Sequence, residues 1–434
     1  MTDFKKTVHN NAVAEQVRKT RLENGLRVIT EHVPGVRSVS VGIWVEAGAR
    51  DESAELSGIS HFIEHMIFKG TKKRDALAIA KEFDIMGGFS NAFTSRELTC
   101  FHLKTLDSSL DKALDLLADI FLNSLFARDE LERERGVILQ EISMVEDSPD
   151  DFIHELFTRL FWGDSVLGRS ILGTVETVSS MTSETLKEFV RRSYSAPRVA
   201  IAAAGNVEHN AFTEKIERLF HAVPDNGAAE REAAPAPETA DAFVQRDIEQ
   251  AHIILGCPGP AITDESRYAA MLLNDILGGS MSSRLFQEIR EKRGLAYSVY
   301  SYINSVHDAG VAGMYAGIAP ENCPEVIRLM KNELEKLAQH PVSSKELEGA
   351  REHAKAAMLL SAEVSDARMM KLARDEIHFN RYLSFDEIME KLDSVTPEEI
   401  TALARGYLDA GVSMACLGPL DDNAITESRK ALGG

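Results

Sequence analysis

The sequence of 434 residues is poor in several features, and each scarcity excludes a class of protein. It has no apolar run near the ~20 residues of a membrane span, so we expect no membrane partner. Residues 1–16 lack both the apolar core of a signal peptide and the Arg-rich, acid-poor composition of an organelle presequence, which predicts a short arm on a cytoplasmic protein. The 4 cysteines lack C-x-x-C spacing, which indicates buried thiols instead of disulfides or a cysteine metal site: Cys100, Cys257, Cys323 and Cys416.

Basic residues are also in short supply. The chain has 48 Lys and Arg against 68 Asp and Glu, which gives a net charge of −20. We therefore expect no nucleic acid partner, because phosphate contacts require a basic patch. The acidic surplus favours basic peptides as ligands, although a generally acidic, soluble surface explains it equally well. The length and the 44% of hydrophobic residues predict a globular protein of two to three domains.

The segment His61-Phe62-Ile63-Glu64-His65 predicts a metal site. Residues four apart project from the same face of an α-helix, so His61 and His65 can bind one ion, and Glu64 lies beside them. This is the H-x-x-E-H order of the inverzincins, in which zinc lowers the pKa of its bound water to roughly 7 and the carboxylate takes the proton. The alternative is a helix with two surface histidines that bind no metal. A third candidate ligand elsewhere in the sequence would favour the metal site over this alternative.

A third ligand is available on the segment DELERERGVILQEIS, which predicts a helix capped by its first residue, Asp129. Glu134 and Glu141 share one stripe of this helix with the aliphatic residues Val137 and Ile138. Glutamates on helices are usually solvated, but a buried carboxylate needs a partner. Two histidines leave a catalytic zinc one protein ligand short, so either glutamate can complete the site.

With these residues the chain resembles the pitrilysin (insulinase) family of zinc peptidases, closest to the bacterial relatives of the mitochondrial processing peptidase beta subunit, over nearly its whole length. In that family a zinc-binding glutamate within an E-x6-E pair follows the motif by about 76 residues, where Glu134 and Glu141 stand here. The resemblance implies one Zn²⁺ per chain, held by His61, His65 and Glu141. It also implies that Glu64 is the general base and that Glu134 orients a ligand.

Two further segments match the family. Residues 87–94, GGFSNAFT, resemble its active-site edge strand, to which the peptide adds as an extra strand, and this implies substrate binding along Ser90, Asn91, Ala92 and Phe93. Residues 290–297, REKRGLAY, resemble the segment whose Arg and Tyr hold the substrate backbone and stabilise the oxyanion, which implies these roles for Arg290 and Tyr297. Without the resemblance, the first segment is an ordinary strand after a Gly-Gly turn and the second a solvated helix end followed by a strand.

The chain repeats itself, and the second copy has no metal ligands. DES at 51–53 recurs at 264–266, and in this register HFIEHM falls on 274–279, NDILGG. DELERERGVILQE aligns with KELEGAREHAKAA, which puts Ala350 and Ala357 at the places of the two glutamates. Only the first copy is therefore metal-competent.

A Pro-, Ala- and Glu-rich stretch at 224–242 separates the copies and has the composition of a linker. We predict two homologous α+β domains, residues 1–223 with the zinc site and residues 243–434 with the Arg and Tyr pair, each a mostly antiparallel sheet packed with helices. Segment 181–207 is similar to segment 395–420, which also indicates that the second half repeats the first. The resemblance implies that the chain forms half of a clam-shell peptidase chamber.

Chains of this size in the family pair to complete the chamber, so that the second domain of one chain faces the zinc-bearing domain of the other. Where one subunit is inactive, the pair is a heterodimer, and the inactive subunit carries a long Gly-rich loop. The corresponding segment here, LGGSMSS at 277–283, is short and Gly-poor. We therefore expect a homodimer, with a heterodimer as the alternative.

The resemblance implies a zinc-dependent endopeptidase that hydrolyses extended, unfolded peptides in a dimeric chamber by metal-activated water, with Glu64 as the base. The alternative is a non-catalytic peptide-binding or structural subunit of such a complex; those members usually lose the base or a ligand, and all four positions are intact here. A closed structural zinc site is disfavoured, because such sites usually have four Cys or His ligands. His154 and His102 are interpreted as a packed or surface residue and a strand residue, not as a fourth ligand.

Overall fold

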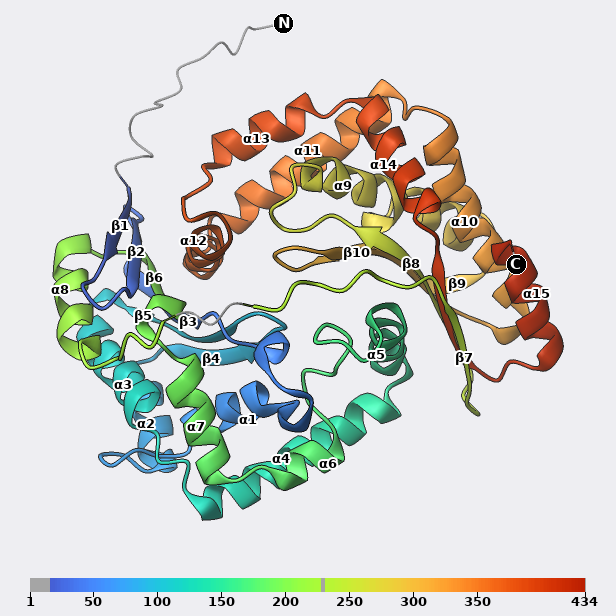
Figure 1. The fold of residues 1–434 in the computed structure, drawn as a ribbon. Helices are drawn as coiled ribbons and strands as arrows, with labels where there is room; N and C mark the ends of the chain where they lie inside the picture. Colours follow the sequence, from blue (N-terminus) through green and yellow to red (C-terminus); the bar gives the residue numbers. More distant parts are fainter. Residues whose placement is uncertain (1–15, 228–230, 434) are drawn as a thin grey trace, which may run out of the picture. The chain divides into compact units, whose positions relative to one another are not determined.

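The computed structural model describes residues 16–227 and 231–433, so nearly all of the predicted N-terminal arm, residues 1–16, lies outside the described residues. The chain forms two compact units, each built on one sheet (Figure 1). The first unit consists of Met1–Ile138, Ile171–Arg231 and Leu360–Ser384, and the second of Leu139–Ser170, Glu232–Leu359 and Phe385–Gly434.

The first unit is built on a six-stranded sheet in the order β1-β2-β6-β3-β5-β4. Its strands are β1 (Val17–Arg21), β2 (Arg27–His32), β3 (Ser38–Val45), β4 (Phe89–Thr94), β5 (Thr99–Leu106) and β6 (Val199–Gly205). Only β2 and β6 pair in parallel, and the other neighbours are antiparallel. The central strands β3 and β6 are buried along nearly their whole length, because helices cover both faces of the sheet.

In this unit α12 crosses one face of the sheet, over β2, β3 and β6, while α1, α3 and α7 lie on the other face (Figure 1). The helices of the unit are α1 (Ile59–Ile67), α2 (Ala76–Ile85), α3 (Leu110–Asn123), α6 (Val175–Ser180), α7 (Ser183–Ser193), α8 (His209–Phe220) and α12 (Ser365–Phe379). The long helix α4 (Arg128–Asp147) begins in this unit, and the division between the units falls within it.

The second unit is built on a five-stranded sheet in the order β7-β11-β8-β10-β9. Its strands are β7 (Asp241–Gln245), β8 (Ala251–Gly259), β9 (Ala296–Ser305), β10 (Gly310–Ile318) and β11 (Ser413–Gly418). The pair β7 and β11 is parallel and the other pairs are antiparallel, so the strand order of the first unit is repeated apart from β1. Two homologous α+β domains with mostly antiparallel sheets are thereby confirmed.

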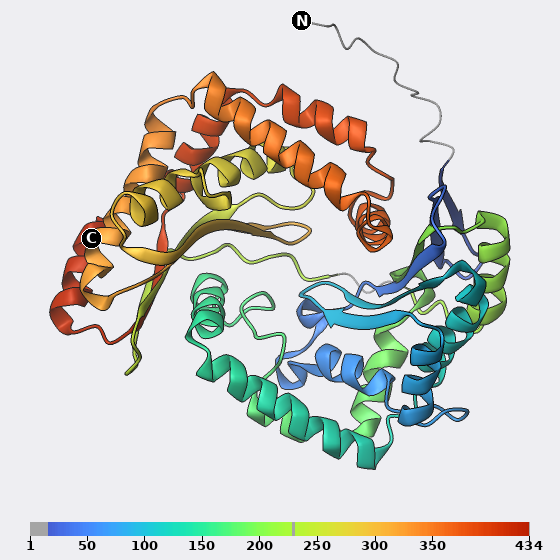
Figure 2. The ribbon, with the colours of Figure 1, turned by 180° about the vertical axis from the view of Figure 1, so that it is seen from behind.

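Helices cover both faces of the second sheet as well, with α10 and α14 on one face and α5 on the other (Figure 2). The helices are α5 (Pro149–Trp162), α9 (Arg267–Asn274), α10 (Cys323–Gln339), α11 (Ser344–Ser361), α13 (Phe385–Ser394), α14 (Pro397–Asp409) and α15 (Asp422–Leu432). Two π-helices, η5 (Asp275–Gly279) and η6 (Phe286–Glu291), follow α9.

Each half of the sequence contributes one helix to the unit formed by the other half. In this respect the compact units differ from the predicted halves, 1–223 and 243–434. The helix α5 packs on β8, where a Cβ added to Gly256 would lie 2.4 Å from the ring of Phe157. Likewise α12 packs on β3, where a Cβ on Gly42 would lie 2.7 Å from Met369 Sδ. A strand glycine therefore permits the close approach of each exchanged helix.

Local signals support the repeat. Thr182 and Thr396 are the N-caps of α7 and α14, and each accepts a hydrogen bond from the backbone N–H three residues on, at 3.2 Å. The strands β6 and β11 follow these helices, as the similarity of segments 181–207 and 395–420 predicts. Between the halves, residues 231–240 form neither helix nor strand, and β7 begins at Asp241, within the predicted linker.

The expected state of the cysteines is confirmed, because all four are buried free thiols. None of the helices in residues 16–227 and 231–433 combines the length and the apolar character that a membrane crossing demands.

Candidate metal and active site

The motif residues lie on α1, whose apolar face fixes the direction of its polar face. The buried apolar side chains of α1 are Ile59, Phe62, Ile63, Met66 and Ile67. His61 and His65 lie one turn apart with their ring centroids separated by 4.6 Å. Both imidazoles therefore point to the same side of the helix, as the four-residue spacing predicts.

The two candidate carboxylates lie on α4. This helix begins at Arg128, so Asp129 is not the cap; it lies in the first turn, where its charge favours the helix dipole. The predicted stripe is correct for Ile138, which is 0% exposed, and wrong for Val137, which is 40% exposed. Adjacent residues on a helix point about 100° apart, so Val137 falls at the exposed border of the face that buries Ile138.

Three side chains are arranged to hold a metal ion. His61, His65 and Glu141 each offer a ligand atom, and these atoms lie within 4.8 Å of one another. In the described residues, 16–227 and 231–433, this is the single group of three or more His, Cys, Asp or Glu with such spacing. Two imidazole nitrogens and one carboxylate oxygen are a donor set that suits a catalytic zinc ion.

The electrostatics of His61 fit this role. Burial, and to a lesser extent the neighbouring His65, lower the pKa of His61 to about 4. The imidazole is therefore neutral at physiological pH, and a metal ligand must be neutral to offer its lone pair. The residues present thus fit a zinc ion.

Glu134 lies outside the group of three and contacts one of its members. Its Oε2 lies 3.2 Å from His65 Nδ1, and its Oε1 pairs with Lys69 Nζ at 2.6 Å. A carboxylate on one ring nitrogen fixes the ring and leaves the other nitrogen to bind a metal. The structure therefore places Glu134 beside His65, one of the candidate ligands.

Glu64 projects from α1 toward the sheet. Its Oε2 accepts a hydrogen bond from Thr94 Oγ1 at 2.6 Å. Thr94 is the last residue of β4, which occupies the edge of the first sheet. The candidate base is thus connected directly to the strand that carries the candidate substrate residues.

The segment Ser90 to Phe93 lies on this edge strand, as expected. It pairs with β5 on one side only, in a register that puts Ser90 opposite Leu103 and Phe93 opposite Cys100. Phe93 packs edge-on against Trp44 at 5.5 Å between ring centroids. The edge of the sheet therefore offers backbone groups to an added strand, while Phe93 anchors β4 to the core.

Arg290 and Tyr297 lie next to each other in the second unit. Arg290 is on η6 and Tyr297 is the second residue of the edge strand β9, the counterpart of β4 in the repeat. Arg290 Nη1 donates to the carbonyl oxygen of Tyr297 at 2.8 Å, and its guanidinium lies 4.9 Å from the centroid of the tyrosine ring. Tyr297 is 79% exposed, so this side chain is accessible to a ligand.

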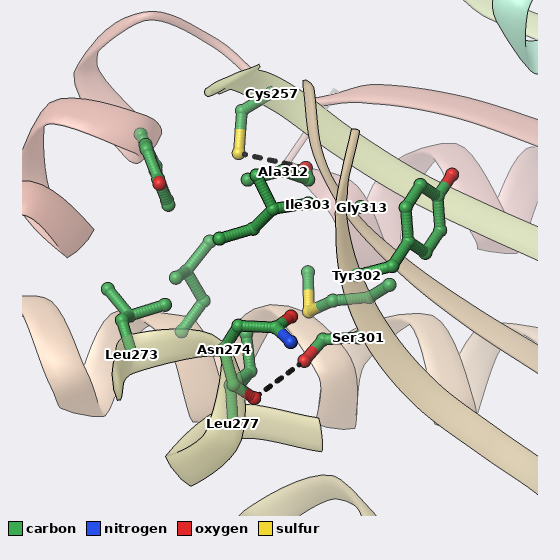
Figure 3. A pocket seen from close by; sticks show the side chains of 12 residues that line it. Cys257, Leu273, Asn274, Leu277, Ser301, Tyr302, Ile303, Ala312 and Gly313 are labelled. Carbon is green, nitrogen blue, oxygen red and sulfur yellow. Dashed lines mark hydrogen bonds between the residues drawn. The ribbon is translucent and has the colours of Figure 1, made fainter. Parts of the chain in front are cut away.

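The place of the metal motif in the second copy is filled by an apolar core. Figure 3 shows a small cavity there, lined by Leu277 from the segment in register with the motif, by Leu273 just before that segment and by Ile303 of β9, among others. Ser301 Oγ donates to the carbonyl oxygen of Asn274 at 3.0 Å. The cavity measures about 10 Å³, room for about one water molecule. Within residues 16–227 and 231–433, the second copy has no group of His, Cys, Asp or Glu with the spacing of the first.

His154 and His102, the two histidines considered as a fourth ligand, contact other parts of the fold. His154 on α5 lies 3.0 Å from the Tyr300 hydroxyl through Nε2, and burial lowers its pKa. His102 lies within β5, opposite Asn91 of β4 and Gly42 of β3. Neither belongs to the metal group, as expected.

Sequence reasoning assigned no role to Thr94 or Lys69. Thr94 was part of the edge-strand segment, but its contact with Glu64 joins residues 30 positions apart. Lys69 lies in the turn just after α1, which ends at Ile67, so helical spacing from His65 gave no clear signal for a partner of Glu134.

Family models match most of the chain in two parts. Residues 27–175 match the insulinase model, peptidase family M16, and residues 180–353 match the peptidase M16 inactive domain. The inactive-domain description agrees with the missing ligands of the second copy.

An uncharacterized zinc protease of Streptomyces coelicolor is 41% identical over 424 residues, which cover 96% of this chain and 92% of the relative. A second uncharacterized zinc protease, from Bacillus subtilis, is 39% identical and covers 93% and 98% of the two chains.

Solved structures show the same fold. A protease from Helicobacter pylori superposes with a TM-score of 0.86 at 24% identity, over 93% of this chain and 99% of that one. A peptidase M16 inactive domain from Pseudomonas fluorescens gives a TM-score of 0.87 at 21% identity, over 93% and 98%. The chain therefore belongs to the insulinase family of peptidases, peptidase family M16.

Proposed function

We propose that the protein is a zinc-dependent endopeptidase that hydrolyses extended, unfolded peptides. The observation that supports this best is the arrangement of the metal group. His61, His65 and Glu141 converge within 4.8 Å, and Glu64, on the same helix as the histidines, is hydrogen-bonded to the edge strand β4. The name zinc protease, which the relatives carry, agrees with the proposal.

In this proposal His61, His65 and Glu141 hold the ion. When bound, zinc supplies Lewis acidity, which activates water near neutral pH and polarises a peptide carbonyl. Glu64 accepts the proton of the attacking water and then donates it to the leaving amine. Glu134 holds the ring of His65, and Lys69 holds Glu134.

The substrate adds to β4 as a further strand. Its backbone pairs with the open edge along Ser90, Asn91, Ala92 and Phe93, and alternate side chains meet the enzyme. Such binding selects for an extended conformation and excludes folded proteins, whose backbone groups are already paired. The net charge of −20 favours basic peptides among these substrates.

We further propose that two chains form the working chamber as a homodimer. Each chamber combines the zinc-bearing domain of one chain with Arg290 and Tyr297 of the other. The tyrosine hydroxyl then stabilises the developing oxyanion, and the guanidinium holds the peptide backbone. A heterodimer with an inactive homologue is the alternative assembly.

A non-catalytic peptide-binding or structural subunit is the second candidate function. The inactive-domain model matches residues 180–353, which include none of the metal or base residues and lie mostly in the half without ligands. The base and all three ligands are present in the other half. This favours catalysis.

The test compares the full-length protein with Glu64→Gln. The wild type is expected to hold one zinc per chain and to cleave an unstructured peptide in a chelator-sensitive way. The variant should hold zinc equally well and lose turnover by at least ~10²-fold, because general acid–base catalysis alone contributes ~10²–10⁴-fold. A wild type that binds zinc and peptide without cleaving would support the non-catalytic function instead.

A further inference from the structure

The N-terminus of α1 has no side-chain cap of the usual kind. Its N-cap residue is Gly58, with φ 93° and ψ 0°, and a Cβ added there would lie 2.6 Å from the carbonyl oxygen of Leu172. Ser, Thr, Asp and Asn, which usually cap helices, are therefore excluded from this position. The backbone N–H groups of the first turn need another acceptor.

Glu52 supplies this acceptor. Its Oε2 accepts a hydrogen bond from the backbone N–H of Gly58 at 2.7 Å, and its Oε1 accepts one from Ser60 at 2.8 Å. The residue is only 4% exposed. Hydrogen bonds to an ionised acceptor are stronger than those between neutral groups, and a negative charge at this end of a helix favours the helix dipole.

The loop that carries Glu52 is itself fixed. Asp51, the last residue of the 3₁₀ turn η1 (Ala49–Asp51), forms ion pairs with Arg198 and Arg231. Just before α1, the carbonyl oxygen of Ser57 accepts a hydrogen bond from Thr177 Oγ1 at 2.7 Å. The carboxylate of Glu52 thus holds α1 to a rigid part of the first unit.

We propose that Glu52 is a positioning residue for the zinc site. It fixes the first turn of α1 through Ser60, and His61 is the next residue along the chain. The direction in which α1 presents His61 then depends on the Glu52 carboxylate. This inference rests on the proposed function, because it assigns Glu52 to the metal site described there.

The repeat provides an internal comparison. Glu265 has the place of Glu52 in the second DES segment, but its side chain is 67% exposed and pairs with Lys391 Nζ at 2.8 Å. In the same register Gly58 falls on Met271, inside α9, so the second copy has no helix N-terminus at the place where Glu52 caps α1. Glu52 therefore caps α1 in the copy that has the candidate metal ligands, and Glu265 makes no such contact in the other copy.

The test uses the full chain with Glu52→Gln and Glu52→Ala, and Glu265→Gln as the matched control. Glutamine keeps the size of the side chain, but its NH₂ group opposes one of the two N–H donors. Backbone amide exchange in residues 57–63 is measured in the metal-free protein. Zinc affinity is measured by competition with a chromophoric chelator.

We expect both Glu52 variants to exchange the Ser60 amide faster and to bind zinc about tenfold to a hundredfold more weakly, the usual effect of removing a group that orients a ligand. Glu265→Gln should behave as the wild type. Wild-type exchange and zinc affinity in both Glu52 variants would overturn the proposal. So would accelerated exchange throughout the first unit, which would make Glu52 a general stability residue. A wild type without zinc would instead overturn the proposed function itself.

Discussion

Thr94 Oγ1 donates a hydrogen bond of 2.6 Å to Glu64 Oε2, and this bond joins the edge strand β4 to the metal helix α1. The strand proposed to bind the peptide is thereby tied to the group proposed to move the proton. A bond from a hydroxyl to a carboxylate restricts the carboxylate's rotation. A peptide paired with β4 would therefore stand in a fixed register with the base, which is the kind of alignment that accelerates a reaction.

Removal of the Thr94 hydroxyl is expected to impair the chemical step. Thr94→Val keeps the β-branched shape and should lower kcat for an extended peptide about tenfold to a hundredfold, with zinc content unchanged. Thr94→Ser keeps the hydroxyl and should stay within a few-fold of wild type. Steady-state kinetics give the measurement, and a valine variant with the kcat of the wild type would show that the bond has no part in catalysis.

The two glutamates of α4 should differ in their effects on zinc. Glu141→Gln removes a proposed ligand, so the protein should lose zinc on dialysis. Glu134→Gln removes the partner of His65 and should retain zinc about tenfold to a hundredfold more weakly. Glu132→Gln, on the same helix and 57% exposed, is the control. Equal loss of zinc from the first two variants would contradict the separate roles.

The sequence was sufficient for those features whose physical cause is local. The spacing of His61, Glu64 and His65 places them on one helical face, and the resemblance then located Glu141. The repeat was visible because both copies keep the same capping and strand patterns, as at Thr182 and Thr396. Helices, strands and the metal group could therefore be predicted from local sequence patterns together with the family resemblance.

Other features depend on contacts between distant segments. The exchange of α5 and α12 leaves no local signal, because each helix is amphipathic whichever sheet it covers. The cap of α1 by Glu52 spans six residues to Gly58, outside the three-residue spacing of an ordinary capping box. The bond between Thr94 and Glu64 likewise depends on how β4 packs against α1.

A side chain at Gly256 should weaken the packing of the exchanged helix α5. Gly256→Ala would bring its methyl group to 2.4 Å from the Phe157 ring, which is 2% exposed and has little room to move. Overpacking of this kind costs about 1–3 kcal/mol, so the free energy of unfolding should fall by that amount. Urea titration of the second unit's transition measures it.

The double variant Gly256→Ala with Phe157→Leu is the control for this prediction. Leucine removes the ring atoms that the methyl group would meet. The double variant should therefore lose less stability than the sum of the two single losses, because residues in contact are coupled. Additive losses would show that the helix avoids the methyl group by some other movement.

The proposed sharing of sites between two chains leads to a complementation prediction. If each chamber combines Glu64 of one chain with Tyr297 of its partner, homodimers of Glu64→Gln and of Tyr297→Phe should both be nearly inactive. In a mixed dimer, one chamber receives both changes and the other receives neither. Mixing should therefore restore activity through the intact chamber.

Equal, random mixing puts half of the dimers in the mixed form, each with one intact site of two, so about a quarter of the wild-type activity is expected if the sites work independently. The two variants are co-expressed with different affinity tags, mixed dimers are verified by sequential purification, and turnover of an extended peptide is measured. Glu64→Gln co-expressed with wild type under the other tag calibrates the yield of mixed dimers. Verified mixed dimers without activity would mean that Glu64 and Tyr297 act within one chain, or that Tyr297 does not take part in catalysis.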